Sequence, residues 1–181
     1  INENSNGQPL HVLDIGTGSG AIAVIVAREI ENCQVTATDN SPQALDIART
    51  NAEIHGVSKK INFVQSDMFK RLPKGSYDFI VSNPPYIETR RLNDLMLDVR
   101  NFEPRYSLDG GADGLDFYRI IISEALSYLA EGGRLVLEIG ETQAKLVSNL
   151  LRVEDKYEEI KVVKDCSGYD RVVSARKITN G

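Results

Sequence analysis

The sequence predicts an α/β fold with a doubly wound, seven-stranded and mostly parallel sheet that ends in an antiparallel hairpin. Apolar runs of strand length alternate with helical patterns along the chain, as in parallel sheets with crossover helices. A glycine-rich turn at residues 16–20 joins the first strand to the first helix, which is typical of nucleotide-binding α/β folds. The last two strand-like runs are joined by residues 165–170 without room for a helix, so they should pair antiparallel.

Each element follows from its apolar pattern and from the residues that begin or end it. Ser41 and Pro42 are an N-cap and a first-turn proline, so a helix should begin there and stop at Gly56. The pair Gly132 and Gly133 should end the helix that begins at Leu115. We expect strands at residues 10–15, 34–38, 61–65, 77–81, 134–139, 157–164 and 171–176. We expect helices at residues 21–30, 42–55, 115–130 and 143–151.

Length and composition indicate one globular domain. Residues 1–9 are polar and are interpreted as a linker or ragged edge, so residues 10–181 should form the domain. The net charge of −5 disfavours extended nucleic-acid binding, which depends on clustered Lys and Arg. No signal peptide or apolar run of membrane length is recognised, and no residues have metal-ligand spacing. Two widely spaced cysteines favour a reducing compartment, so we expect a cytoplasmic protein without membrane contact.

The clearest chemical signal is residues 82–86 (SNPPY), which follow the predicted strand 77–81. Pro84 and Pro85 have fixed φ angles and no N–H, so they end the strand and keep Asn83 extended. The Asn83 side-chain oxygen and the Pro84 carbonyl then form a rigid row of hydrogen-bond acceptors beside the Tyr86 ring. The alternative is an ordinary strand-ending turn, because Asn-Pro is a common turn pair.

A rigid row of acceptors suits a planar NH2 group that is conjugated to a carbonyl or an aromatic ring. Its two N–H groups can donate to Asn83 and Pro84 while Tyr86 stacks on its plane. The row would then hold a poorly nucleophilic nitrogen in position for attack on an electrophile. Asn83, Pro84, Pro85 and Tyr86 are therefore the candidate catalytic residues.

The glycine turn is the candidate binding site for the molecule that supplies the electrophile. Gly16, Thr17, Gly18, Ser19 and Gly20 lack bulky side chains and precede a helix N-terminus, whose free N–H groups can face a ligand. The same glycines also satisfy a dinucleotide-binding pattern, so the turn alone leaves both ligands open.

Acidic residues near the turn favour a cationic ligand. Asp14 lies just before the turn, where a carboxylate repels a pyrophosphate but suits an ammonium or a sulfonium. Asp39 and Asn40 follow the second strand, where a carboxylate accepts from ribose hydroxyls. Asp67 and Met68 follow the third strand and can contact an adenine. S-adenosylmethionine has both cations, a ribose and an adenine, so we expect it as the cofactor. As alternatives, the carboxylates cap turns and Met68 is a core residue.

These motifs resemble those of a class I S-adenosylmethionine-dependent methyltransferase. The Asn-Pro-Pro-Tyr motif is shared by enzymes that methylate the exocyclic NH2 groups of adenine, cytosine or glutamine. Further motifs resemble the HemK/PrmC family of release-factor glutamine methyltransferases, and the resemblance covers residues 10 to about 176. These motifs are residues 99–104 (VRNFEP), 110–116 (GGADGLD), 137–140 (LEIG) and 168–171 (GYDR).

The resemblance implies N5-methylation of the glutamine in the Gly-Gly-Gln motif of peptide-chain release factors. By position, the glycine turn, Asp39, Met68 and Asn83 would bind the cofactor, and residues 83–86 would bind the glutamine amide. Family members usually carry Trp where Met68 stands, so contact with the adenine should differ. We do not recognise the family's N-terminal helical domain, which helps to dock the release factor, and we expect residues 10–181 to be the catalytic domain alone.

Other functions remain open from the sequence. The acceptor can be a ribosomal-protein glutamine, or a flipped adenine or cytosine in a nucleic acid. A non-catalytic docking module and a dinucleotide oxidoreductase are further alternatives, although the latter leaves the Asn-Pro-Pro-Tyr motif unexplained.

Overall fold

The structure is a computed structural model, and it describes residues 7–72, 75–94 and 104–179. Within these residues a seven-stranded sheet has the order β3-β2-β1-β4-β5-β7-β6. The strands are β1 (Leu10–Ile15), β2 (Cys33–Asp39), β3 (Ile61–Gln65), β4 (Tyr77–Ser82), β5 (Leu129–Glu138), β6 (Tyr157–Lys164) and β7 (Asp170–Lys177). The first five strands pair in parallel, whereas β7 pairs antiparallel with both β5 and β6. The predicted mostly parallel sheet with an antiparallel C-terminal hairpin is confirmed.

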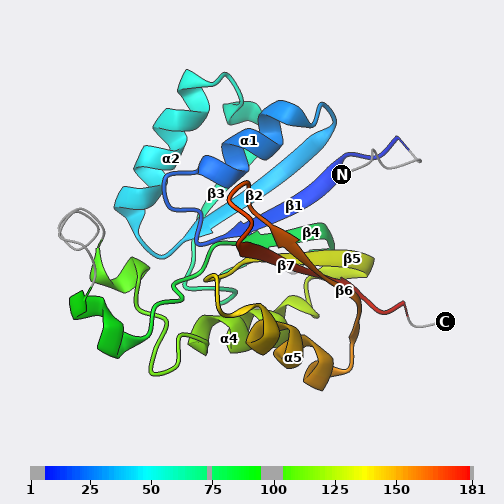
Figure 1. Ribbon diagram of the computed structural model, residues 1–181. Coiled ribbons are helices and arrows are strands. Elements are labelled where there is room, and N and C mark those ends of the chain that lie inside the picture. Colours follow the sequence, from blue (N-terminus) through cyan, green and yellow to red (C-terminus); the bar gives the residue numbers. More distant parts are fainter. Residues whose placement is uncertain (1–6, 73–74, 95–103, 180–181) are drawn as a thin grey trace.

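Helices cover both faces of the sheet (Figure 1). The α-helices in the described residues are α1 (Ala21–Glu29), α2 (Pro42–Ile54), α4 (Asp116–Ala125) and α5 (Ala144–Glu154). Helices α1 and α2 lie on one face, and α4 and α5 lie on the other. Alternate residues of β1 therefore enter different cores: Val12 packs with α1, whereas Leu13 packs with α4 and α5. Burial on both faces explains why these strands are almost continuously apolar.

The chain reverses its direction of winding beside β1, and this places the candidate site. From β1 the chain winds outward through β2 to β3, and then returns to β4 on the other side of β1. In open α/β sheets, ligands bind in the crevice that such a switch creates at the carboxyl ends of the strands. The residues that follow β1, β2, β3 and β4 meet at this edge.

One boundary prediction is wrong, because Gly132 and Gly133 do not end a helix. Helix α4 ends at Ala125 and β5 begins at Leu129, so both glycines lie inside the strand. A Cβ on Gly133 would lie 2.9 Å from the Tyr77 carbonyl oxygen, and the register of β4 on β5 shifts nearby, between Tyr77 and Phe79. The glycine pair thus marks an irregular stretch of strand where two backbones approach closely.

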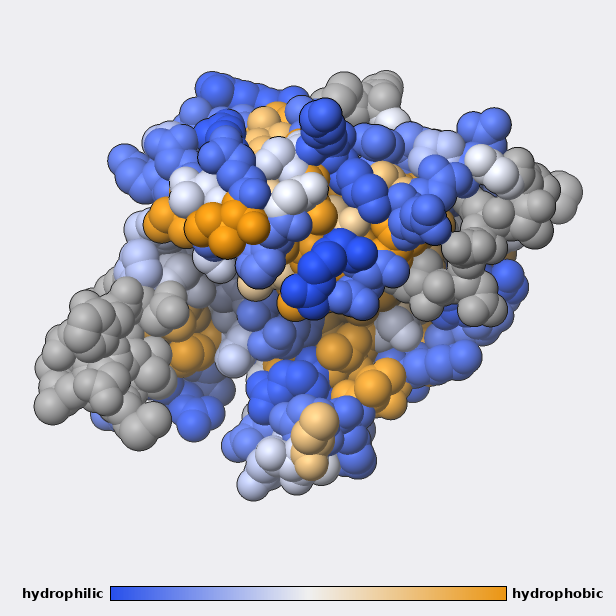
Figure 2. Space-filling view, turned by 90° about the horizontal axis from the view of Figure 1, so that it is seen from above, coloured by the Kyte–Doolittle hydropathy of each residue, from blue (hydrophilic) through white to orange (hydrophobic). Residues whose placement is uncertain are grey.

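The long segment between β4 and α4 has short 3₁₀ turns, η2 (Thr89–Asp94) and η3 (Arg105–Ser107). The predicted motif at residues 99–104 falls outside the described residues except for Pro104, as does most of the predicted linker at residues 1–9. The face seen in Figure 2 is largely hydrophilic and shows hydrophobic residues in separate patches. Among the described residues, no helix has both the length and the apolarity that a membrane crossing requires.

Candidate active site

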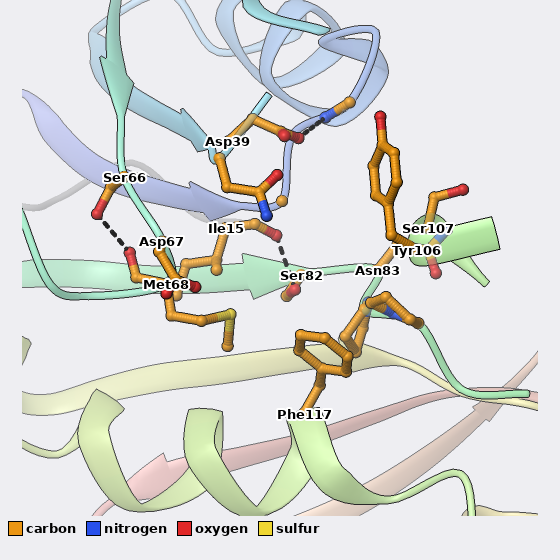
Figure 3. A pocket seen from close by; sticks show the side chains of 15 residues that line it. Ile15, Asp39, Ser66, Asp67, Met68, Ser82, Asn83, Tyr106, Ser107 and Phe117 are labelled. Carbon is orange, nitrogen blue, oxygen red and sulfur yellow. Dashed lines mark hydrogen bonds between the residues drawn. The ribbon is translucent and has the colours of Figure 1, made fainter. Parts of the chain in front are cut away.

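A cavity of about 150 Å³ lies at the crevice where the strand order reverses. Segments far apart in the sequence converge on it, from the ends of four neighbouring strands, from the turn η3 and from α4 (Figure 3). Its described lining residues are Ile15, Gly16, Gly18, Asp39, Asn40, Ser66, Asp67, Met68, Ser82, Asn83, Pro84, Pro85, Tyr106, Ser107 and Phe117. The glycine turn and the proline-rich segment, which the sequence suggested as two halves of one site, therefore share one cavity.

The glycine turn takes a backbone conformation that suits glycine. Gly16 and Gly18 have φ angles of 68° and 56°, in the left-handed region that side chains disfavour. The Thr17 N–H donates to the Thr38 carbonyl at 2.8 Å, which ties the turn to the end of β2. Gly16 and Gly18 line the cavity with bare backbone, so a ligand can approach the turn closely.

Asp39 fixes the opposite side of the turn. Its carboxylate accepts from the backbone N–H of Gly18 at 2.9 Å and from that of Ser41 at 2.9 Å. The first of these bonds is drawn in Figure 3, where Asp39 projects from the end of β2. Because each carboxylate oxygen has more than one lone-pair direction, Asp39 can hold the turn and still accept from ligand hydroxyls. The neighbouring Asn40 also lines the cavity.

Asp14 lies behind the turn, outside the described lining of the cavity. It is 1% exposed and accepts from the Thr17 hydroxyl at 2.6 Å, while its Oδ1 has no hydrogen-bond partner among the described residues. Burial raises the pKa of Asp14 from 3.8 to about 6, although the Thr17 hydroxyl and the Ala23 backbone N–H oppose this shift. Asp14 therefore stabilises the turn through its hydrogen bond with Thr17. Because Asp14 does not line the cavity, its carboxylate can affect a bound ligand only through longer-range electrostatics.

Ser19 and Gly20 also lie outside the described lining. The Ser19 carbonyl accepts from the Asn51 side chain at 2.8 Å. A Cβ on Gly20 would lie 2.9 Å from the Cβ of Ala48, so this glycine allows α1 to begin against α2. Both residues position the start of the helix.

Asp67 and Met68 form the wall that follows β3. Asp67 pairs with Lys70 at the surface, and its side chain is 55% exposed. Met68 has a φ of 52°, and its side chain lies toward α4 beside the cavity. Its partial burial against the core makes it both a lining and a packing residue, so the two interpretations offered by the sequence are compatible.

The segment after β4 enters the cavity as the sequence suggested, with one exception. The Ser82 hydroxyl donates to the Ile15 carbonyl at 2.7 Å, which fixes the end of β4 against β1. Asn83 is exposed, Pro84 is buried, and both line the cavity together with Pro85. Tyr86 instead borders a second hollow of about 370 Å³, formed with residues that follow β5. Its partly buried ring packs against the core, so stacking on an acceptor would require the ring to move.

The sequence analysis missed six of the described lining residues: Ile15, Ser66 and Ser82 at or just after strand ends, and Tyr106, Ser107 and Phe117 beyond the proline motif. Tyr106 and Ser107 come from the turn η3, and Phe117 comes from the first turn of α4. Tyr106 is 61% exposed, which is high for a tyrosine, and Figure 3 shows its ring at the side of the cavity. Long connections inside a compact domain are often functional, and the fold shows which residues of the segment between β4 and α4 reach the site.

The charge of the cavity distinguishes between the two candidate ligands, S-adenosylmethionine and a dinucleotide. Its described lining includes the acidic residues Asp39 and Asp67 and no Lys or Arg. A pyrophosphate needs cations or free helix N–H groups to offset its charge, whereas a ligand with cationic groups is favoured here. The cavity therefore fits S-adenosylmethionine better than a dinucleotide. Among the described residues, no group of three or more His, Cys, Asp or Glu could hold a metal ion.

A family model described as "Methyltransferase small domain" matches residues 3–99, which is more than half of the chain. The chain belongs to this methyltransferase family. The match runs from before β1 to beyond the Asn-Pro-Pro-Tyr segment, so it includes the glycine turn and the proline motif.

Curated relatives of this methyltransferase domain carry a more specific name. The chain is 44% identical over 165 residues to a "Release factor glutamine methyltransferase" of Geobacter sulfurreducens, a match that covers 91% of this chain and 57% of the relative. A protein of the same name from Moorella thermoacetica is 44% identical over 160 residues, covering 88% of this chain and 56% of the relative. The chain thus spans little more than half the length of these relatives.

Solved structures show the same fold. A methyltransferase from Pyrococcus furiosus superposes with a TM-score of 0.68 at 22% identity, covering 94% of this chain and 76% of that one. At this identity the likeness supports the methyltransferase fold alone.

Proposed function

We propose that this domain transfers a methyl group from S-adenosylmethionine to the side-chain amide nitrogen, N5, of a protein glutamine. We further propose that the acceptor is the Gly-Gly-Gln glutamine of a peptide-chain release factor. The observation that carries the proposal is that Asn83 and Pro84 line the same cavity as Gly16, Gly18 and Asp39. The names of the relatives support the choice of acceptor.

The cofactor half of the cavity has groups that complement S-adenosylmethionine. The turn at Gly16 and Gly18 offers bare backbone, Asp39 offers a carboxylate to the ribose, and Asp67 and Met68 offer an acceptor and an apolar surface to the adenine. When bound, S-adenosylmethionine supplies a methyl group on a positively charged sulfur. The cavity's described lining includes Asp39 and Asp67 and no Lys or Arg, so it would not oppose a positively charged ligand.

The acceptor half of the cavity would position the amide nitrogen, which is a weak nucleophile. The lone pair of an amide nitrogen is delocalised into the carbonyl group, so the nitrogen must be held close to the methyl group and in line with it. Asn83 Oδ1 and the Pro84 carbonyl can accept the two amide N–H groups, which fixes the plane and the direction of the nitrogen. Fixed φ angles at both prolines keep these acceptors in place before the substrate arrives.

The proposal is tested by incubating the protein with S-adenosylmethionine that carries an isotope label in its methyl group and measuring which substrate becomes labelled. We expect label on a release factor, and none on a release factor whose Gly-Gly-Gln glutamine is replaced by alanine. Duplex DNA and ribosomal proteins are assayed in parallel, since label on either in place of the release factor would contradict the proposed acceptor.

Asn83→Ala tests the acceptor half. Because Asn83 is exposed, the substitution should leave the midpoint of thermal unfolding unchanged while turnover falls about 100-fold, the scale of losing one polar contact to the reacting group. Asn149→Ala, at an exposed position on α5, is the matched control and should retain full turnover. Turnover of Asn83→Ala within about threefold of the unmodified protein would remove Asn83 from the mechanism.

A further inference from the structure

A buried glutamine links the proline-rich segment to three other parts of the fold. Gln143 immediately precedes α5 and is 8% exposed. Its backbone N–H donates to the Gly140 carbonyl at 2.9 Å, in a turn just after β5. Since β4 and β5 are parallel neighbours, this turn lies next to the segment that follows β4.

The side-chain amide of Gln143 has its hydrogen-bonding groups satisfied on both sides. Its Nε2 donates to the Tyr86 carbonyl at 3.0 Å and to the Gly114 carbonyl at 3.2 Å. Its Oε1 accepts from the Gly140 N–H at 3.0 Å, and the Tyr118 hydroxyl lies 3.5 Å away. Two carbonyls on one side and an N–H on the other leave a single favourable orientation of the amide.

The glycines of residues 110–114 bring a second backbone against the same place. A Cβ on Gly110 would lie 2.8 Å from the Pro85 carbonyl oxygen, and a Cβ on Gly114 would collide with the Tyr86 carbonyl oxygen. Both approaches are too close for any side chain. This segment, singled out in the sequence without a role, therefore packs directly behind Pro85 and Tyr86, and Gln143 bonds the two backbones together.

The candidate acceptors thus lie between two fixed points. On one side, Ser82 is held by its β-ladder and by its hydroxyl bond to the Ile15 carbonyl. On the other side, the Tyr86 carbonyl is held by Gln143. Proline rings fix φ at Pro84 and Pro85, but the ψ angle of Pro85 and the Tyr86 torsions stay free unless the Tyr86 peptide is restrained.

We infer that Gln143 is a positioning residue for methyl transfer: its amide fixes the Tyr86 carbonyl and so sets the direction of the Asn83 and Pro84 acceptors. This inference rests on the proposed function of that segment. Gln143 lies outside the described lining of the cavity, so it acts through Tyr86 and does not touch the reacting groups.

Two variants remove the Nε2 donors in different ways. Gln143→Glu keeps the shape of the side chain but replaces the donors with an acceptor, and Gln143→Met keeps its length without polar atoms. We expect kcat per folded protein to fall at least about tenfold in both, since small displacements of positioned groups cost large factors in rate. Calorimetric Kd for S-adenosylmethionine should stay within about twofold, because the cofactor half of the cavity is formed by β1, β2 and β3.

Tyr157→Phe is the matched control for losing a buried hydrogen bond. The Tyr157 hydroxyl donates to the Ile122 carbonyl at 2.7 Å in the same core, and Tyr157 lies outside the described lining of the cavity. This variant should keep kcat within about twofold. A kcat within about twofold in both Gln143 variants, or an equal loss in Tyr157→Phe, would overturn the inference.

Hydrogen exchange provides a readout that does not depend on activity. The N–H groups of Ile87 and Thr89 donate to the Leu108 and Gly111 carbonyls, so their exchange reports how firmly the segment after Tyr86 is held. Both Gln143 variants should exchange faster there, and Tyr157→Phe should not. If the unmodified protein labels no acceptor, the proposed function fails by itself, and unchanged exchange in the Gln143 variants would refute the positioning role.

Discussion

Replacing Asp14 with asparagine should stabilise the fold in a pH-dependent way. Asp14 is completely enclosed, and burial raises the pKa of its carboxyl from 3.8 to about 6. A shift of this size corresponds to roughly 3 kcal/mol of unfolding free energy. The asparagine side chain would be neutral at every pH, would have nearly the same size, and could still accept from the Thr17 hydroxyl.

The sign follows from proton binding. Below pH 3.8 the carboxyl group is neutral in both the folded and the unfolded protein, so burial costs nothing extra. Between pH 3.8 and about 6 the unfolded chain ionises first, and the stability of the unmodified protein falls as pH rises. Above about pH 6 both states are ionised and the loss stays constant, so Asp14→Asn should gain stability from about pH 4 to about pH 7 relative to the unmodified protein.

The absolute gain at neutral pH should be smaller than about 3 kcal/mol. A buried NH2 group without an acceptor costs about 1–3 kcal/mol, which offsets part of the gain at every pH. The pH-dependent difference is therefore the quantity to measure, by urea unfolding at intervals of about one unit between about pH 4 and about pH 7. The chain has no tryptophan, so far-ultraviolet circular dichroism is the suitable signal.

An exposed carboxylate provides the control. Asp46 pairs with Arg49 on the surface of α2, so Asp46→Asn makes the same chemical change at an exposed position and is measured in parallel. A constant difference between Asp14→Asn and the unmodified protein across this pH range would refute the assignment of a buried, raised-pKa carboxyl.

Three further predictions concern the turns around the site. Gly114→Ala should destabilise the fold by at least about 2 kcal/mol, because φ is +73° and the new Cβ would collide with the Tyr86 carbonyl oxygen; Gly168→Ala, with φ +86° and open space, should cost only about 1 kcal/mol in the same urea assay. Asp39→Ala should raise the calorimetric Kd for S-adenosylmethionine at least about tenfold, and an unchanged Kd would contradict its ribose role. Ser41→Ala removes the N-cap of α2 and should cost about 1 kcal/mol in urea unfolding, whereas no loss would show that the cap bond is unimportant.

The strands and their positions along the chain were largely predictable from the sequence. The run 10–15 was predicted to the residue, as was 61–65, because each is bounded by glycine, proline or polar residues. The helix α2 was also predicted, since its Ser-Pro start has a local physical cause. The boundary between α4 and β5 was not, because an apolar run followed by two glycines fits both a helix end and an irregular strand.

The candidate site, like the fold, was predictable from the sequence only in part. Residues at strand ends, such as Gly16, Asp39 and Asn83, were predicted because parallel strands bring their carboxyl ends to one edge. Asp14 comes just before the glycine turn in the sequence, but it is buried behind the turn. Tyr86 borders a different hollow from Asn83, Pro84 and Pro85, the other three residues of its motif. Adjacency in a motif therefore does not ensure a shared cavity, because the packing of the surrounding segments decides which hollow each side chain borders.

The sequence alone determined the α/β class, the glycine turn, the proline-locked segment and the edge of the sheet on which they meet. Local chemistry suffices for these features, because glycine, proline and capping residues act over a few positions. The tertiary structure decided which distant groups complete the site: Tyr106 and Phe117 at the cavity, and Gln143 behind Tyr86. Their positions depend on how α4, α5 and a long connecting segment pack against the sheet, and no local pattern encodes such long-range contacts.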